Sequence, residues 1–260
     1  MLTMGVDIGS TASKAVIMED GSRILARALV AVGTGTRGPQ EVYKKVLEEA
    51  GVIRDQISRI VATGYGRMKF QEADRELSEV SCHGKGVKYL CPEARTVIDI
   101  GGQDAKAMLL DENGNLDDFV MNDKCAAGTG RFLDAMARVL DVDVTELGAI
   151  SERSEHPTSI SSTCAVFAES EVISRLAADE HIEDIAAGIH ASVAKKVGGL
   201  ALRIGYQPQV VMSGGVAKNR GIVKALEQEL KCSILVPEDC QMAGAIGAAL
   251  FAWNDVRKTL

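Results

Sequence analysis

Short apolar runs alternate with polar turns in the first part of the chain. The runs at residues 4–8, 14–18 and 59–63 each lead into a turn that contains Gly or Asp, so each is predicted to be a strand. Residues 41–50 instead place Val42, Val46 and Ala50 on one face, with Lys and Glu opposite, which predicts a helix. The chain is therefore expected to begin with a strand hairpin, then a helix and a further strand.

The same succession returns later in the chain. Residues 7–24 read DIGSTASKAVIMEDGSRI and residues 99–116 read DIGGQDAKAMLLDENGNL, so that Asp, Ile, Gly, Lys and Ala recur in order at an offset of 92. Strands are expected at 96–100 and 106–110, and a helix near 130–140. Self-similarity at a fixed offset indicates duplicated architecture. The sequence predicts an α/β fold of two similar lobes, residues 1–90 and 91–260.

The rest of the second lobe carries one long helical pattern and two short strands. Apolar residues recur every three to four positions from 185 to 204, which predicts a long amphipathic helix. Strands are expected at 210–212 and 233–236, and a helix of small residues at 241–253. Whether this last helix packs back on the first lobe stays open.

The two repeated turns have the composition of phosphate-binding loops. A phosphate needs backbone N–H groups at close range, which favours Gly and other small residues, and it needs a cation. A third loop, Ser-Gly-Gly at the end of the strand at 210–212, adds to the pair. A strand end followed by a plain turn would explain one such loop but not three. The candidate nucleotide ligands are Ser10, Thr11, Ser13, Lys14, Gly101, Gly102, Gln103, Gly214, Gly215, Lys218 and Asn219, with Lys106 as a second candidate cation.

Carboxylates at the two strand ends are candidate metal ligands and catalytic groups. Asp7 and Asp99 are expected to hold Mg²⁺ through water, since Mg²⁺ keeps much of its hydration shell. Gln103 is the candidate for sensing the γ-phosphate or positioning water, with Asp104 as the alternative and Asp7 as a further catalytic residue.

These loops together resemble the actin, sugar kinase and Hsp70 ATPase superfamily. In that superfamily a first hairpin holds phosphates, a second hairpin completes the clamp, and an SGG loop contacts adenosine, with ATP in a cleft between two lobes. SGGVAKN at 213–219 is similar to the adenosine loop, and AGAIGAA at 243–249 is similar to the helix that follows it. The chain has neither a Walker A motif nor a GxGxxG fingerprint.

Two cysteines precede predicted helices in similar surroundings, Cys125 in NDKCAAGTG and Cys164 in SSTCAVF. A helix N-terminus favours a thiolate and stabilises an anionic iron–sulfur cluster. A [4Fe–4S] cluster takes four thiolates, so two per chain would suffice in a symmetric dimer. The alternative is that each cysteine is a small buried apolar residue.

The segments NDKCAAGTGRF, SSTCAVFAESEVIS, TVIDIGGQD, ATGYGR and DIGSTASK together resemble the activator component of 2-hydroxyacyl-CoA dehydratases. The resemblance implies an oxygen-sensitive homodimer with one [4Fe–4S] cluster, held by Cys125 and Cys164 of each chain. It further implies that ferredoxin or flavodoxin supplies one electron, and that ATP hydrolysis drives this electron into the dehydratase. The ATPase subunits of benzoyl-CoA reductases are more distant relatives.

Composition and charge limit the partners and the compartment that we expect for this protein. A net charge of −7 and no basic stripe argue against nucleic acid as a partner. No apolar run approaches the ~20 residues that cross a bilayer, and the six cysteines include no CxxC, so a cytoplasmic protein with reduced thiols is expected. A small-molecule kinase of the same superfamily and a non-redox ATP-dependent assembly protein remain as alternatives. The acyl group of the dehydratase substrate stays open, because that substrate binds the partner.

Overall fold

The computed structural model describes residues 1–161 and 164–259, and the chain divides into two compact units. The first unit comprises residues 1–94, 110–117 and 237–260, and the second comprises residues 95–109 and 118–236. Among the described residues, no helix is both long and apolar enough to cross a membrane.

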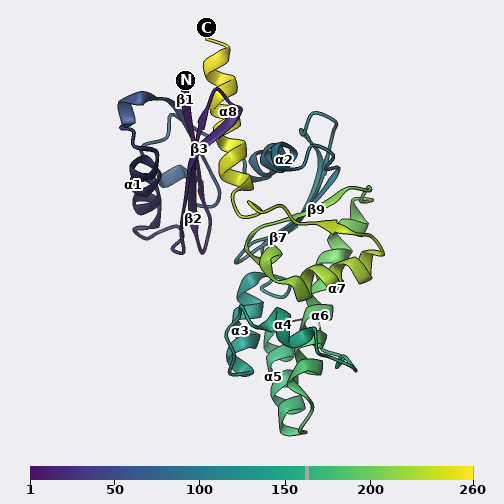
Figure 1. Cartoon of the computed structure of the whole chain (residues 1–260). Helices are drawn as coiled ribbons and strands as arrows, with labels where there is room; N and C mark the ends of the chain where they lie inside the picture. The colour runs from purple at the N-terminus through teal and green to yellow at the C-terminus, as the bar shows by residue number, and fades with distance from the viewer. Residues whose placement is uncertain (162–163, 260) are drawn as a thin grey trace. The chain divides into compact units, whose positions relative to one another are not determined.

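The first unit is built on a five-stranded sheet with the order β3-β2-β1-β4-β5. β1 is antiparallel to β2 and parallel to β4. Figure 1 shows α1 on one side of this sheet and α8 on the other. The elements are β1 (Leu2–Ile8), β2 (Ser13–Glu19), β3 (Arg23–Val30), α1 (Gly38–Ala50), η1 (Arg54–Gln56), β4 (Ile57–Thr63), η2 (Arg67–Lys69), β5 (Arg75–Glu76), α2 (Glu79–Leu90) and α8 (Ala243–Arg257).

Alternation along the strands of the first unit sends side chains to two separate cores. Ala15 and Ile17 of β2 pack with Val42 and Val46 of α1. Val16 and Met18 of β2 face the opposite way and pack with residues 245, 246 and 249 of α8. Because successive residues of a strand point to opposite faces, one apolar strand serves both helices.

Glycines allow α8 to approach its neighbours at backbone distance. A Cβ on Gly5 of β1 would lie 2.0 Å from the carbonyl oxygen of Ala245, and one on Gly247 would lie 1.8 Å from that of Cys82 in α2. The small-residue pattern of the last predicted helix is therefore a packing requirement, and the helix contacts β1, β2, β4 and α2.

The second unit repeats this sheet with the order β8-β7-β6-β9-β10, in which β6 is antiparallel to β7 and parallel to β9. The helices described in this unit all follow β8 in the chain. The elements are β6 (Thr96–Ile100), β7 (Ala105–Leu110), β8 (Leu116–Asn122), α3 (Gly130–Val139), α4 (Leu147–Ser151), α5 (Ala165–Ala177), α6 (Ile182–Arg203), β9 (Val210–Ser213), η3 (Gly215–Lys218), α7 (Arg220–Leu230) and β10 (Ile234–Leu235). The predicted strands and helices all occur, and the α/β fold of two actin-like lobes is confirmed.

Candidate functional site

The first predicted phosphate loop is a tight hairpin turn between β1 and β2. Asp7 pairs with Lys14 across the hairpin, and the Gly9 N–H donates to the carbonyl oxygen of Ala12 at 3.0 Å. The Lys14 Nζ lies 3.1 Å from Oδ2 of Asp7. A carboxylate and an ammonium group thus lie side by side where the sheet meets the turn.

The second loop reproduces this geometry in the second unit. Asp99 pairs with Lys106, the Gly101 N–H donates to the carbonyl oxygen of Asp104 at 2.9 Å, and Lys106 Nζ lies 3.2 Å from Oδ2 of Asp99. The strand register, turn hydrogen bond and ion pair all recur at the offset of the sequence repeat, so the duplication extends to atomic detail.

The two lysines nevertheless differ in accessibility. The side chain of Lys14 is 15% exposed, whereas that of Lys106 is 1% exposed and lies 2.7 Å from a second carboxylate, that of Asp104. Lys106 neutralises two carboxylates inside the unit, so the structure does not support its candidacy as a second phosphate cation. Gln103, at the tip of the same turn, is exposed.

The carboxylate of Asp7 is buried between two glycines that the sequence reasoning did not select. A Cβ on Gly64 would lie 2.4 Å from its Oδ1, and one on Gly244, in the first turn of α8, would lie 3.0 Å from its Oδ2. Gly64 also has a φ of +84°, which L side chains rarely adopt. The Gly that follows strand 59–63 was the available signal for the first of these contacts.

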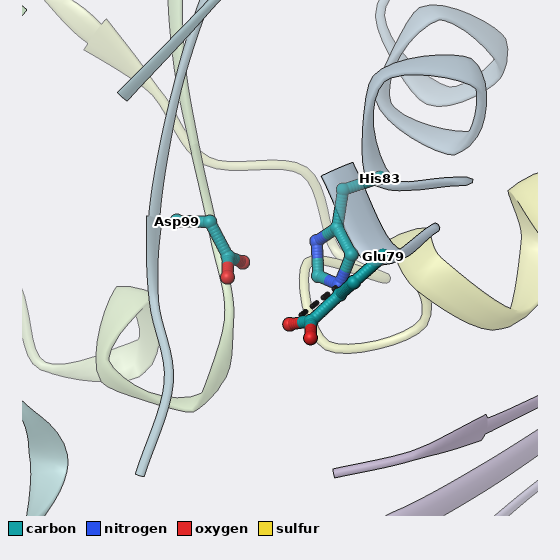
Figure 2. A group of neighbouring side chains, drawn as sticks. All are labelled: Glu79, His83 and Asp99. Atoms are coloured by element: carbon teal, nitrogen blue, oxygen red, sulfur yellow. Dashed lines mark ion pairs between the residues drawn. The ribbon is translucent and has the colours of Figure 1, made fainter. Parts of the chain in front are cut away.

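α2 adds a buried histidine to the first unit. His83 lies 4.0 Å from Glu79 one turn earlier on the same helix, as the dashed line in Figure 2 shows. Figure 2 also labels Asp99, the strand-end carboxylate of the second repeat. A Cβ on Gly244 would lie 2.8 Å from Nε2 of His83. No apolar periodicity around His83 distinguishes it in the sequence from a surface residue.

Hydroxyl groups of the first loop have different roles. Thr11 is exposed and Ser10 is half-buried. Ser13 is fully buried, and its hydroxyl donates to the carbonyl oxygen of Val32 at 2.9 Å. In this structure Ser13 therefore fastens the loop to the following segment, and its contact with a nucleotide stays a prediction. The Thr34 N–H likewise donates to the carbonyl oxygen of Gly9 at 2.9 Å.

The third predicted loop follows β9 and contacts the second hairpin. Ser213 donates to Oδ1 of Asp99 at 2.7 Å. Gly214 has a φ of +88°, and a Cβ there would lie 2.3 Å from the carbonyl oxygen of Ile100. Gly215 and Lys218 are exposed, and Asn219 caps α7 by accepting from the Ile222 N–H at 3.2 Å. The structure thus unites two of the predicted loops within the second unit.

The two candidate cluster cysteines are half-buried but lie differently with respect to their helices. Cys164 is the N-cap residue of α5. Cys125 lies in the loop between β8 and α3, and Thr129 is the N-cap of α3. The expected helix-start position is therefore confirmed for Cys164, whereas Cys125 is separated from its helix by the turn at residues 126–129. Residues 162–163, which precede Cys164, lie outside the described residues.

Hydrogen bonds fix the Cys125 loop on both sides. The amide of Asn122 donates to the carbonyl oxygens of Cys125 at 2.9 Å and Ala127 at 3.2 Å. Beyond the loop, the Gly130 N–H donates to the carbonyl oxygen of Gly101 at 2.9 Å. The second hairpin thus contacts the start of α3 directly, a connection that the sequence did not reveal because it is not local.

The other cysteines have environments that suit packing. Burial raises the pKa of the Cys82 thiol to about 12, and burial also raises the pKa of Cys91 and of Cys232. Cys240 is buried. A raised pKa disfavours the thiolate that binds metal, so the surroundings of Cys82, Cys91 and Cys232 disfavour a role as cluster ligands.

His190 is buried on α6 and hydrogen-bonded. Its Nδ1 lies 2.9 Å from Oγ of Ser151 and its Nε2 lies 3.3 Å from Nδ2 of Asn219. Desolvation lowers the pKa of His190 to about 4, so the imidazole is neutral near pH 7.

Comparison with known proteins agrees with this geometry. The profile of the BadF/BadG/BcrA/BcrD ATPase family matches residues 4–252. The chain belongs to this family. One relative is the 2-hydroxyisocaproyl-CoA dehydratase activator of Clostridioides difficile, which is 56% identical over 100% of this chain and 97% of the relative. Another is the activator of lactoyl-CoA dehydratase of Anaerotignum propionicum, which is 52% identical over 99% of this chain and 100% of the relative.

A solved structure of a family member also matches over its whole length. The activator of the 2-hydroxyisocaproyl-CoA dehydratase from Clostridium difficile with bound ADPNP has a TM-score of 0.96 and 56% identity, and the match covers 100% of this chain and 97% of that one. The resemblance to dehydratase activators drawn from the sequence motifs is confirmed at the level of the whole fold.

Proposed function

We propose that this chain is an ATP-driven one-electron donor that activates a 2-hydroxyacyl-CoA dehydratase. One observation carries the proposal: two Asp–Lys hairpins repeat in register on a chain that matches dehydratase activators from end to end. A small-molecule kinase would share the hairpins, but it would leave the two half-buried cysteines of the second unit without a role.

ATP is bound, in this proposal, through the three loops. Lys14 is the accessible cation for phosphate, and Ser10 and Thr11 add hydroxyl donors, with Gly101 and Gly102 offering close backbone approach. Gly214, Gly215, Lys218 and Asn219 serve the adenosine. Gln103, exposed at its turn, positions the attacking water; Asp104 is the alternative, although its carboxylate is already paired with Lys106.

Both strand-end carboxylates fit a hydrated Mg²⁺ ion by their chemistry. Asp7 and Asp99 are ionisable oxygen donors, each next to a turn that serves a phosphate loop. Their pairing with Lys14 and Lys106 favours ligation through water, because each carboxylate already has one charged partner. Mg²⁺ supplies charge neutralisation for the phosphates.

The cysteines fit a [4Fe–4S] cluster shared between two chains. Cys125 and Cys164 are half-buried thiols of the second unit, and each is followed in the sequence by a small alanine residue. Two thiols per chain supply the four ligands only in a dimer. α5 supports a homodimer as well, because Val166, Phe167 and Ile173 expose 67%, 68% and 52% of their surface just after Cys164. When bound, such a cluster supplies one electron at low potential.

The partners follow from this assignment. A 2-hydroxyacyl-CoA dehydratase receives the electron, and a ferredoxin or flavodoxin replaces it. The relatives activate dehydratases of 2-hydroxyisocaproyl-CoA and of lactoyl-CoA, so the acyl group is decided by the partner and not by this chain. All six cysteines are free, which supports a reducing compartment and thus the cytoplasm.

A nucleotide assay tests the proposal against a kinase. The chain, purified without oxygen, is given Mg²⁺ and ATP together with a panel of sugars and organic acids. We expect ADP and inorganic phosphate in equal amounts and no phosphorylated acceptor. Dehydratase turnover with dithionite as the electron source should require ATP and should fail with ADPNP. A phosphorylated acceptor, or activation by ADPNP equal to that by ATP, would refute the proposal.

A further inference from the structure

α6 is a 22-residue helix that contacts three functional segments of the second unit. Its residue 190 contacts the loop at 213–219, its residues 188 and 192 contact the segment before Cys164, and its residues 196–197 contact the Cys125 loop. A helix rises 1.5 Å per residue, so the contacts from 188 to 197 fall within about 14 Å of one rigid element.

The contact between α6 and the 213–219 loop is a buried chain of hydrogen bonds, and the donor and acceptor of each bond can be assigned. Ser151 donates its only proton to the carbonyl oxygen of Gly148 at 2.8 Å, so its oxygen accepts from Nδ1–H of His190. Nε2 of His190 then carries no proton and accepts from the amide of Asn219. Because the amide oxygen of Asn219 accepts from Ile222 N–H, both ends of this side chain are fixed.

Packing at this point leaves no room for another arrangement. A Cβ on Gly221 would lie 2.4 Å from Nδ1 of His190 and 2.5 Å from Oγ of Ser151. His190 itself is 2% exposed. The imidazole therefore holds Asn219, and through it the end of the third loop, in one orientation relative to α6.

α6 contacts each of the two cysteine segments. Ser192 donates to the carbonyl oxygen of Ser161 at 3.3 Å, and a Cβ on Gly188 would lie 1.9 Å from the carbonyl oxygen of Thr158. In the other segment, a Cβ on Gly128 would lie 3.1 Å from Cγ of Lys196. Both cysteine segments thus pack against the helix that also carries His190.

We propose that α6 couples the 213–219 loop to both cysteine segments, with His190 as the positioning residue that contacts this loop. The proposal rests on the proposed function, because it takes that loop as a nucleotide contact and the cysteines as the responding site. The contact between α3 and Gly101 reaches the Cys125 side alone, whereas α6 reaches both. Coupling requires one element whose state both sites bias. α6 is the candidate because it contacts the 213–219 loop as well as both cysteine segments.

Hydrogen–deuterium exchange with and without ADPNP tests this in the full anaerobic chain. His190→Leu removes the acceptor for Asn219, and His190→Gln restores one through its amide oxygen. Ile189→Val, at a fully buried neighbour on α6, is the control for a small loss of packing. Ser192→Ala breaks only the link to Ser161, and it serves as the second variant if His190→Leu fails to fold.

In the wild type and in Ile189→Val, ADPNP should slow exchange at 213–219, at 122–129 and at 158–161. In His190→Leu we expect the dissociation constant for ADPNP to rise about tenfold, which corresponds to about 1.4 kcal/mol, and His190→Gln should recover at least half of that change. At saturating ADPNP, His190→Leu should keep the response at 213–219 and lose it at both cysteine segments. Ser192→Ala should lose the response at 158–161 alone.

Two results would overturn the proposal: unchanged ADPNP affinity in His190→Leu, or a full response at the cysteine segments in that variant. A wild type in which ADPNP alters only 213–219 would also overturn it. The outcome is separate from the redox assignment, because exchange is read whether or not iron is bound. A chain that lacks iron yet shows the coupled response would refute the cluster and leave the coupling intact.

Discussion

Lys14 and Lys106 occupy equivalent positions of the repeat, but replacing each with methionine should have a different main effect. Lys106→Met should mainly lower stability, and Lys14→Met should mainly weaken nucleotide binding. Lys106→Met leaves Asp99 and Asp104 without their shared cation in a place where the lysine side chain is 1% exposed. Removing one partner from a buried ion pair costs about 3–5 kcal/mol. For a chain of this size, that predicts a melting temperature lower by roughly 6–20 °C.

Lys14→Met should destabilise the fold less and weaken nucleotide binding more. It leaves only Asp7 unpaired, and that carboxylate still lies beside Gly244 in the first turn of α8, where the helix dipole favours negative charge. We expect about 1–3 kcal/mol of lost stability. Losing one charged hydrogen bond to phosphate costs about 1.5–3 kcal/mol, so the ADPNP dissociation constant should rise roughly 10- to 150-fold.

Scanning calorimetry and titration calorimetry with ADPNP measure the two effects separately. Lys106→Met combined with Asp104→Asn removes the charge of one of the two carboxylates that Lys106 had neutralised, and it should recover part of the lost melting temperature. The reasoning is refuted if both single variants melt at the same temperature, or if Lys106→Met is as stable as the wild type.

Three further perturbations have definite expected outcomes. Gly64→Ala should lower the free energy of unfolding by about 1–3 kcal/mol because its backbone is left-handed, and by more because the new Cβ would collide with the Asp7 carboxylate. Gly51→Ala is the control, with a similar φ and open space around the Cβ, and it should lose clearly less stability in urea unfolding. Equal losses in the two variants would exclude the collision. Asn122→Ala should speed iron loss from the anaerobic protein, because it frees the carbonyl of Cys125, and an unchanged rate of bleaching would argue against this. His190 has a pKa lowered from 6.5 to about 4, so its contribution is present above pH 6.5 and is lost as pH falls toward 4. Wild-type stability should therefore drop by about 3 kcal/mol more than that of His190→Gln over this window, and parallel curves in urea unfolding would contradict it.

The sequence predicted what is local or repeated. Asp7, Lys14, Asp99 and Lys106 were identified because the repeat places the same residues at the same offset, and the strand register places each Asp opposite its Lys. The helix after Cys164 was expected from periodicity and begins at Ala165.

The remaining features depend on contacts between distant segments. Whether a lysine faces solvent or carboxylates is decided by packing, so Lys106 looked equivalent to Lys14 until its burial was known. The bond from the Ser13 hydroxyl to Val32 could not be predicted, because Val32 lies nineteen residues away in the chain. The bond of His190 to Asn219 spans twenty-nine residues and leaves no periodic trace.

Iron and sulfide content of anaerobically purified protein tests the electron-donor proposal most directly. Wild-type protein, and Cys91→Ser as a matched control, should contain about four iron and four sulfide per dimer. Cys125→Ser and Cys164→Ser should each lose most of both while still binding ADPNP. Wild-type protein without iron, or either variant with full iron and sulfide, would contradict the assignment of these two cysteines as the ligands of a shared cluster.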